Sequence, residues 1–450
     1  MSRALDSLAL PASHAGKLHR TLSFNDLVMY GLAYVSPAAP FQILGFVWLR
    51  SNGLIALAYI LGGVCMYFTA RSYAVMTEAV PSAGSVYGFA RHALGPFAGF
   101  VAGWMILLDY LLIPGYMYDV IAVALETLMP RVDRAVWIVL LCLLTLAVNW
   151  FGLKVTTRVN IFAVVSQVVL IAVLLVFSVL ALHAGKGTGA LTLRPIFSAN
   201  LFDIHGLFAA TSICVMSFLG FDAVSTLAEE VKGNDRRQVG RAIIAVLLLS
   251  AALFTLVAWV LGNLLPGLSI KDAAAACYEL AAWSIGPWAS ITLAWATATI
   301  IGFTNVLPMQ VGVARILFAM GRDRQLPQAI ARVHPKYGTP YVGMLVTGAI
   351  TLAVALVMRY HVDEIASLVN FGALSGFLLL HVSVLALFGA RARTGQRFAH
   401  IAVPIVGAAV VLAVMTGMSS LALTLGGAWL VAGLLYGAAL HRRRRDALPI

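Results

Sequence analysis

The sequence predicts an all-α polytopic membrane protein with twelve transmembrane helices. Of its 450 residues, 61% are hydrophobic and 11% are charged, whereas a soluble domain carries about 25% charged residues. Many apolar runs reach the roughly 20 residues that a helix needs to cross a bilayer. A transmembrane β-barrel is excluded, because its strands would alternate in polarity over about 10 residues.

Twelve spans can be drawn, and an even number places both termini on one side of the membrane. Two further stretches are too short or too mixed in polarity to span. Residues 81–95 are expected to form an amphipathic cytoplasmic helix, and residues 269–286 an external helix. The spans are expected at 24–48, 54–77, 97–127, 135–152, 159–182, 206–230, 240–262, 288–319, 341–358, 364–389, 401–417 and 420–440.

The distribution of positive charge predicts the orientation of the chain. Of the 30 Lys and Arg residues, 23 lie in the termini and in the loops on their side of the membrane. Positive residues gather on the cytoplasmic side, so both termini are expected in the cytoplasm. The net charge of +12 therefore indicates membrane orientation rather than a nucleic-acid partner. Seven remain on the other side: Arg50, Arg131, Arg134, Lys186, Arg194, Lys271 and Arg359.

Two spans contain residues that interrupt helices. Span 1 reads MYGLAYVSPAAPF, with Gly31, Pro37 and Pro40 near its middle, and span 6 reads FLGFD. Broken backbone is tolerated inside a bilayer only where it lines a cavity or is buried in protein. Because the two spans are five apart, they predict two inverted five-helix repeats with a substrate site at the paired breaks. Two ordinary kinks remain the alternative.

This interpretation divides the chain into five parts. They are a cytoplasmic N-terminal tail (1–23), a first five-helix repeat (24–182), a second, inverted repeat (206–389), two additional helices (401–440) and a basic cytoplasmic C-terminus (441–450).

Three carboxylates lie well inside the spans: Asp109 and Asp119 in span 3, and Asp222 in span 6. A charged residue at the bilayer centre costs at least about 2.5–3.5 kcal/mol. No Lys or Arg occupies a neighbouring position in mid-span. Asp109 and Asp222 therefore indicate a cation from outside the chain, which is a proton, a metal ion or an organic ammonium. Neutral, hydrogen-bonded acids that hold neighbouring helices are the alternative.

Aromatic residues surround the first of these acids in the segment LLDYLLIPGYMYD. Asp109 and Tyr116 share a helical face, with Tyr110 beside them. Aromatic rings next to a carboxylate suit an alkylammonium ion. Asp119 lies about 80° away from Asp109 around the helix, so it is expected to face elsewhere, near the outer surface.

Several other polar residues fall within spans and fit a cavity lining or helix packing. His381 is expected to be a packed histidine. Glu229 and Glu230 end span 6 and fit either a structural or a gating role. The glycine pairs at 99–103 and 372–376 are typical of close helix packing. Possible cavity or coupling residues are Ser166, Gln167, Thr304, Asn305 and Asn370.

A set of motifs resembles the amino acid–polyamine–organocation transporter superfamily over nearly the whole length. The motifs are GLAYVSP in span 1, PSAGSVYGFARHALG after span 2, SFLGFDAVSTLAEEV in span 6, and ARILFAMGRDRQLP followed by HPKYGTP after span 8. The chain looks most like bacterial putrescine importers, which share LLDYL and FLGFDAV. Many amino acid transporters of the superfamily carry a glutamate where this chain has Asp222.

The resemblance implies a LeuT-type fold with a substrate site between broken spans 1 and 6. Some proton-coupled relatives have a lysine in span 5, where this chain has Gln167. Coupling through that lysine is thus in doubt, and Asp222, Asp109 or a cytoplasmic Glu would carry the proton. Carried onto this sequence, the site includes Tyr34, Val35, Ser36, Pro37, Asp109, Tyr110, Phe218, Gly220, Phe221 and Asp222.

These features together lead us to expect a secondary transporter that imports a small organic cation, putrescine first, across a bacterial inner membrane. Alternating access and proton coupling are implied, with the substrate, protons and the lipid bilayer as partners, and without a metal or a cofactor. An amino acid permease of the same superfamily is the alternative. A channel, a sensor or an intramembrane enzyme is disfavoured: the chain has no HExxH motif, and GLSI at 267–270 lacks the second glycine of a serine protease motif.

Overall fold

The protein is a bundle of helices, as the apolar runs predict. The computed structural model describes residues 22–80, 85–151, 157–228, 231–232, 237–322, 324–335, 337, 339–389 and 397–446. Within these ranges the only β-type pairing is an isolated bridge between Leu22 and Val231. Ten helices are long and apolar enough to cross a membrane, and a bent pair raises the number to eleven. The all-α polytopic fold is confirmed, whereas the count of twelve stays a prediction.

The helices follow the expected spans closely, because each apolar run ends in polar or glycine-containing sequence. The helix α7 (Arg134–Trp150) has 17 residues and is one of the shorter apolar helices. The span predicted at 288–319 consists of α12 (Pro287–Ala296), the π-helical turn η6 (Thr297–Ile301) and α13 (Gly302–Arg322). The other spans are α4 (Ile55–Ala79), α6 (Pro96–Leu128), α8 (Thr157–His183), α10 (Arg237–Leu264), α14 (Tyr341–Met358), α15 (Val362–Phe388), α16 (Val403–Met415) and α17 (Ser420–Asp446).

Both predicted interruptions are present. The first span is divided into α1 (Phe24–Val35), α2 (Ala39–Gln42) and α3 (Leu44–Arg50), with a bend of 58° before α3. The sixth span is α9 (Ile204–Phe218) followed by the 3₁₀ helix η3 (Phe221–Leu227). The chain turns at Ser36, with φ of 64°, and at Gly220, with φ of 110°.

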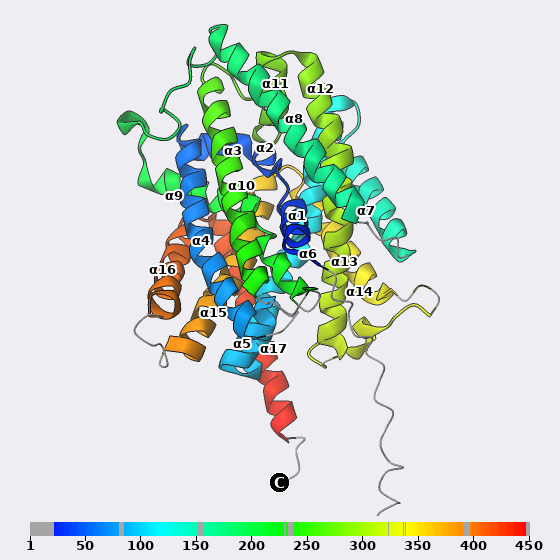
Figure 1. Ribbon diagram of the computed structural model, residues 1–450. Helices are drawn as coiled ribbons and strands as arrows, with labels where there is room; N and C mark the ends of the chain where they lie inside the picture. Colours follow the sequence, from blue (N-terminus) through cyan, green and yellow to red (C-terminus); the bar gives the residue numbers. More distant parts are fainter. Residues whose placement is uncertain are drawn as a thin grey trace, which may run out of the picture.

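Two short helices lie outside the spans, at opposite ends of the bundle in Figure 1. The amphipathic helix expected at 81–95 is α5 (Ser85–Leu94), which buries Val86, Phe89 and Ala90; the first four residues of that prediction lie outside the described part of the chain. The helix expected at 269–286 is shorter and consists of η5 (Ala273–Ala275) and α11 (Ala276–Ser284). We call the two ends of the molecule the α5 end and the α11 end.

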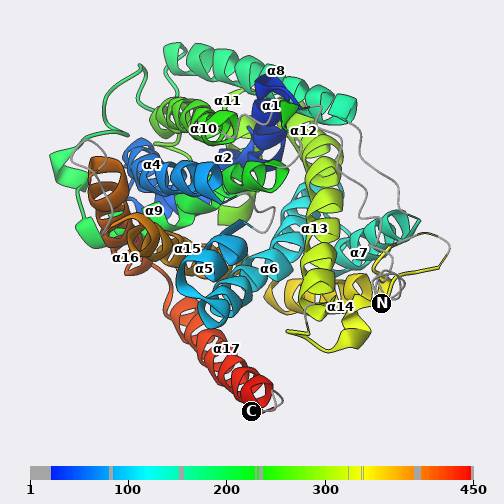
Figure 2. The same ribbon diagram turned by 60° about the horizontal axis from the view of Figure 1, so that its bottom comes forward.

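The long helix α6 organises the bundle, because neighbours pack around it on several sides. Its contacts include α5, α7, α13, α14, α15 and α17, and α4 runs along α10 in both views (Figures 1 and 2). Glycines permit two of these close approaches, as the glycine pairs predict. A side chain at Gly99 would lie 2.6 Å from Arg91 Cβ of α5, and one at Gly372 of α15 would lie 2.7 Å from the backbone nitrogen of Asp109.

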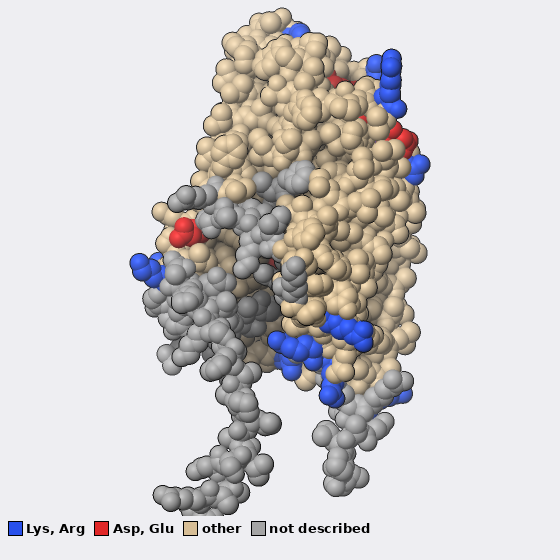
Figure 3. All heavy atoms as spheres, turned by 90° about the vertical axis from the view of Figure 1, so that its right-hand side faces the viewer, with Lys and Arg blue, Asp and Glu red and all other residues tan. Residues whose placement is uncertain are grey.

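The surface has the apolar belt of a membrane protein. The face in Figure 3 is mainly free of charged residues, and Lys and Arg gather towards its lower end, with a mixed charged group near the upper right. At the α11 end, Arg134 forms ion pairs with Glu126 and Asp272. The helices α16 and α17 lie at the edge of the bundle (Figure 2) and expose apolar side chains such as Leu435, as lipid-facing helices do.

Candidate functional site

The break in the first span is held from α8 by one side chain. The Oε1 atom of Gln167 accepts two hydrogen bonds. One comes from the Ser36 hydroxyl at 2.9 Å and the other from the Ala38 backbone N–H group at 3.3 Å. Gln167 is buried, so this oxygen satisfies two donors that water does not reach. The residue suspected of a coupling role thus caps the unwound segment.

The two breaks lie against each other. A side chain at Gly220 would lie 2.8 Å from Tyr34 Cδ1 and 3.1 Å from the Tyr34 carbonyl oxygen. Since Gly220 also has a positive φ, glycine is required there both for conformation and for space. The contact brings the end of α1 and the start of η3 to one place in the bundle.

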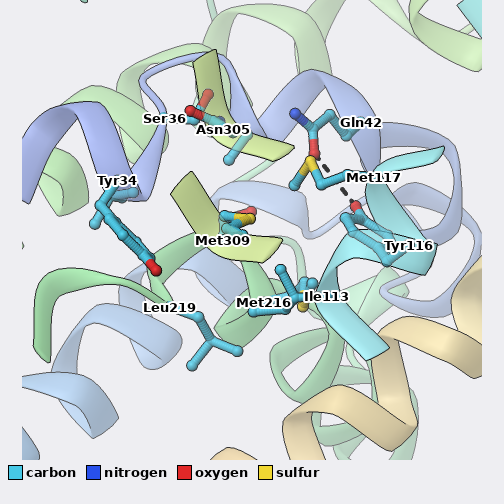
Figure 4. Close-up of a pocket in the computed structure, with 13 residues that line it drawn as sticks. Tyr34, Ser36, Gln42, Ile113, Tyr116, Met117, Met216, Leu219, Asn305 and Met309 are labelled. Carbon is cyan, nitrogen blue, oxygen red and sulfur yellow. Dashed lines mark hydrogen bonds between the residues drawn. The ribbon is translucent and has the colours of Figure 1, made fainter. Parts of the chain in front are cut away.

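A small cavity lies beside these breaks (Figure 4). It has room for little more than a water molecule, so a substrate needs a wider opening than this conformation gives. The hydroxyl of Tyr116 donates a hydrogen bond to Gln42 Oε1 at 3.4 Å across it. None of the lining residues is charged: they are Tyr34, Val35, Ser36, Ala39, Gln42, Ile113, Tyr116, Met117, Met216, Ser217, Leu219, Asn305 and Met309.

Asp109 and Asp222 lie towards the α5 end of this cavity. Asp109 is on α6, four residues before the cavity residue Ile113, and its buried Oδ1 atom has no hydrogen-bond partner within the residues that the structure describes. Asp222 lies in the first turn of η3. Its Oδ1 atom accepts a hydrogen bond from the Gly220 backbone nitrogen at 3.3 Å, and its Oδ2 atom accepts one from the Tyr73 hydroxyl at 3.4 Å.

The two acids share one aromatic surrounding. The phenols of Tyr34, Tyr73 and Tyr110 each lie within electrostatic range of both carboxyl groups, and the two carboxyl groups lie within range of each other. No ion pair joins either acid to Lys or Arg in the described part of the chain. We refer to Asp109, Asp222, Tyr34, Tyr73 and Tyr110 as the acid cluster.

The acid cluster and the cavity are adjoining but distinct. Tyr34 belongs to both, whereas neither acid lines the cavity. A hydrogen-bond chain continues from the acid cluster towards α5, because Ser85 Oγ lies 3.4 Å from the Tyr73 hydroxyl and 3.3 Å from Ser225 Oγ. The arrangement thus offers two acidic side chains at the α5 end and a neutral, partly apolar wall towards the α11 end.

Two aromatic residues suggested for the site face neighbouring helices. Phe218 packs on Tyr59 and Phe254, and Phe221 packs on Tyr73 and Phe377. Their rings pack beside the break in the sixth span and do not line the cavity.

The remaining suggested residues are divided between the cavity and the bundle. Pro37 lies in the turn between α1 and α2. Asn305 lines the cavity, and its Nδ2 atom has no hydrogen-bond partner among the side chains that are described. Asn370 instead donates to the Ser212 carbonyl oxygen at 2.6 Å and joins α15 to α9. The Thr304 side chain and residues Glu229 and Glu230 lie outside what the structure describes.

His381 is a packed histidine, as expected. Its ring nitrogens contact Ser72 Oγ at 2.9 Å and Thr69 Oγ1 at 3.4 Å. A side chain at Gly407 would lie 2.3 Å from the ring, so this glycine makes room for it. The histidine therefore joins α15 to α4 and α16.

Sequence reasoning missed several residues of the site. Tyr73 gave only a weak signal, because it was a single polar residue in an apolar span. Gln42 directly follows the interrupted segment of span 1, and this position was the signal that could have identified it. The cavity methionines gave no signal, because methionine in a membrane helix is ordinary core sequence. They are Met117, Met216 and Met309.

A polytopic helical bundle whose two interrupted helices meet beside buried acids has the architecture of a secondary transporter. The chain belongs to the amino acid permease family of the amino acid–polyamine–organocation superfamily, since the model of that family matches residues 26–438.

Curated relatives support the same class. The chain is 32% identical to the low-affinity putrescine importer PlaP of Escherichia coli (strain K12), over 98% of this chain and 97% of the relative. It is 27% identical to the branched-chain amino acid permease BcaP of Bacillus subtilis (strain 168), over 86% and 84% of the two chains. A methylthioribose transporter of the same organism is 28% identical, over 83% and 82%.

Proposed function

We propose that this transporter imports a small organic diamine, putrescine or a similar polyamine, across a bacterial inner membrane by proton-coupled alternating access. Both termini lie in the cytoplasm in this proposal, and the α11 end faces outwards. The two five-helix halves, 24–182 and 206–389, form the inverted repeats, with the broken helices α1 and α9–η3 in corresponding positions.

The observation that carries the proposal is that, among the described residues, Asp109 and Asp222 form no ion pair with a basic side chain. Buried carboxylates are strongly disfavoured unless a positive charge or a proton compensates them. Within the described residues no basic side chain does so. An alkylammonium ion would gain charge attraction from both acids and cation–π contact with the rings of the acid cluster.

A diamine would use both parts of the site. One ammonium group would lie among the acids, and the methylene chain would pack on the apolar cavity wall beyond Tyr34. Methionine side chains suit such a chain because they are flexible and polarisable. The name of the E. coli relative, a putrescine importer over nearly the full length of both chains, supports the same substrate class.

An amino acid permease is the second candidate, and the cavity itself favours it. None of the cavity-lining residues is charged, and unwound backbone at Ser36 and Leu219 lines it. Exposed helix ends of this kind bind the carboxylate and amine of a zwitterion. In that case the acids would bind protons only.

Transport by the purified protein in liposomes separates the candidates. Putrescine-loaded vesicles should accumulate radiolabelled putrescine by counterflow, and unlabelled diamines should compete while neutral amino acids should not. Competition by neutral amino acids with no effect of diamines would support the permease instead. Saturable counterflow would also exclude a channel, a sensor and an enzyme.

A further inference from the structure

Asp119 is a buried acid that the proposed binding of substrate does not use. It lies on α6, three residues beyond Tyr116 of the cavity, towards the α11 end. Its side chain is 0% exposed, and neither carboxyl oxygen has a hydrogen-bond partner in the described part of the chain. Almost every buried polar group in a protein is hydrogen-bonded, so two orphaned oxygens on one side chain need an explanation.

An isolated carboxylate is strongly disfavoured in such surroundings. Burial without a partner penalises the ionised form much more than the neutral form. Burial in this conformation therefore favours the protonated form of Asp119. The helix α12 and the turn η6, which pack on α6, contain no charged residue that would change this balance.

Two arginines approach Asp119 without bonding to it. Arg134 and Arg359 are both within electrostatic range. Arg134 is already engaged, because it pairs with Glu126 of α6 and with Asp272, which precedes η5. Its guanidinium group therefore already binds two carboxylates.

Arg359, at the end of α14, is less engaged. Its Nη1 atom donates to the Leu356 carbonyl oxygen at 2.7 Å, but among the described residues its buried Nε atom has no hydrogen-bond partner. That atom forms a long ion pair with the Asp133 carboxylate at 3.9 Å, and the guanidinium group lies over the ring of Tyr360. The Arg359 Nε–H group and the Asp119 carboxyl group, which both lack a hydrogen bond within the described residues, thus belong to the adjoining helices α14 and α6.

Asp119 is also connected to the cavity. Asp119 lies within electrostatic range of the phenol of Tyr116, and that phenol donates its hydrogen bond to Gln42 of the broken first span. A change in the charge of Asp119 therefore acts on a group that lines the cavity.

We propose that Asp119 is a proton-binding residue in the half of the transporter nearer the α11 end, and that it releases its proton when α6 and α14 bring it against Arg359. The carboxylic acid becomes a carboxylate, the proton leaves to water, and the Arg359 guanidinium group balances the new charge. This step rests on the proposed proton-coupled import, and it adds a titrating group separate from the acids that bind substrate.

Asp119→Asn tests the step, because asparagine keeps the size of the side chain but never ionises. Putrescine counterflow at equal pH on both sides should stay within threefold of wild type. Accumulation driven by an imposed pH gradient should fall at least tenfold, and the pH dependence of uptake should flatten. A wild-type pH profile and gradient response in this variant would overturn the inference.

The two proposals fail in different ways. If the wild-type protein shows no putrescine counterflow, the proposed function is wrong. If the wild-type protein shows counterflow and Asp119→Asn couples normally to the pH gradient, only the role of Asp119 is wrong.

A second readout does not depend on transport. Infrared spectra of the wild type should contain a C=O stretching band of a protonated carboxylic acid that Asp119→Asn removes, and its presence in the variant at equal strength would contradict the assignment. Arg359→Gln should move the half-maximal pH of gradient-driven uptake upwards by about one unit, because an arginine beside an acid favours its ionised form. An unchanged half-maximal pH would exclude Arg359 as the partner.

Discussion

Gln167 Oε1 lies 2.9 Å from the Ser36 hydroxyl, and this hydrogen bond joins α8 to the point at which α1 ends. Ser36 has a φ of 64°, a conformation that costs of order 1–3 kcal/mol for a residue other than glycine. The same oxygen also accepts the Ala38 backbone N–H group. A side chain from another helix therefore stabilises the unwound segment that lines the cavity.

Replacement of Gln167 should loosen this segment. Gln167→Ala leaves two buried donors unsatisfied, which should cost about 1–3 kcal/mol of stability and reduce transport at least tenfold. Thermal unfolding in detergent and uptake in liposomes measure the two effects. Val168→Ala is the control, because Val168 is exposed on the same helix; equal effects of both changes would contradict the role of Gln167.

Neutralisation of the acid cluster should abolish import of a diamine. Asp222→Asn and Asp109→Asn each remove a buried charge that would pair with an ammonium group, a loss of about 3–5 kcal/mol, so uptake should fall about 100-fold or more. Membrane insertion, checked by the amount of folded protein, should be preserved. Normal putrescine uptake by Asp222→Asn would remove this residue from the mechanism.

The contact between the two breaks should not tolerate a methyl group. Gly220→Ala places a Cβ atom 2.8 Å from Tyr34 Cδ1 and adds about 1–2 kcal/mol of backbone strain. We expect reduced thermal stability and a loss of uptake. Gly427→Ala in α17 is the matched control, since a side chain there meets no atom within 4 Å. Comparable behaviour of the two variants would show that the breaks are not in close contact.

The hydroxyl of Tyr73 should tune the acid cluster without being essential. Tyr73→Phe removes the donor to Asp222 Oδ2 and keeps the ring contacts with Phe221 and Phe377. A single hydrogen bond contributes about 0.5–1.5 kcal/mol, so the apparent affinity for substrate should weaken roughly threefold to tenfold. Tyr67→Phe, at an exposed position of the same helix, should leave the affinity unchanged.

The packing around His381 gives a prediction for stability alone. Gly407→Ala places a Cβ atom 2.3 Å from the imidazole ring, and overpacking of this kind typically costs about 1–3 kcal/mol. The unfolding temperature should fall, and the affinity for substrate in the remaining folded protein should not change. Gly389→Ala, where a side chain meets nothing within 4 Å, serves for comparison.

The sequence by itself determined the class of the protein, the approximate bounds of its helices and the two interruptions. These features are local: apolar length sets a span, and Pro and Gly interrupt it. The three membrane acids were also identified from their positions alone, because a carboxylate in an apolar run is costly wherever its neighbours lie.

Only the tertiary structure decided which side chains meet. Gln167 and Ser36 are 131 residues apart, and Tyr73 and Asp222 are 149 apart. The helix α6 has apolar residues on all sides, so no amphipathic pattern reveals how it is rotated. Helix periodicity predicted that Asp119 faces away from Asp109. Because helix packing fixes the rotation of α6, only the structure showed that Asp109 lies with Asp222 among the tyrosines and that both Asp119 oxygens lack a hydrogen-bond partner within the described residues.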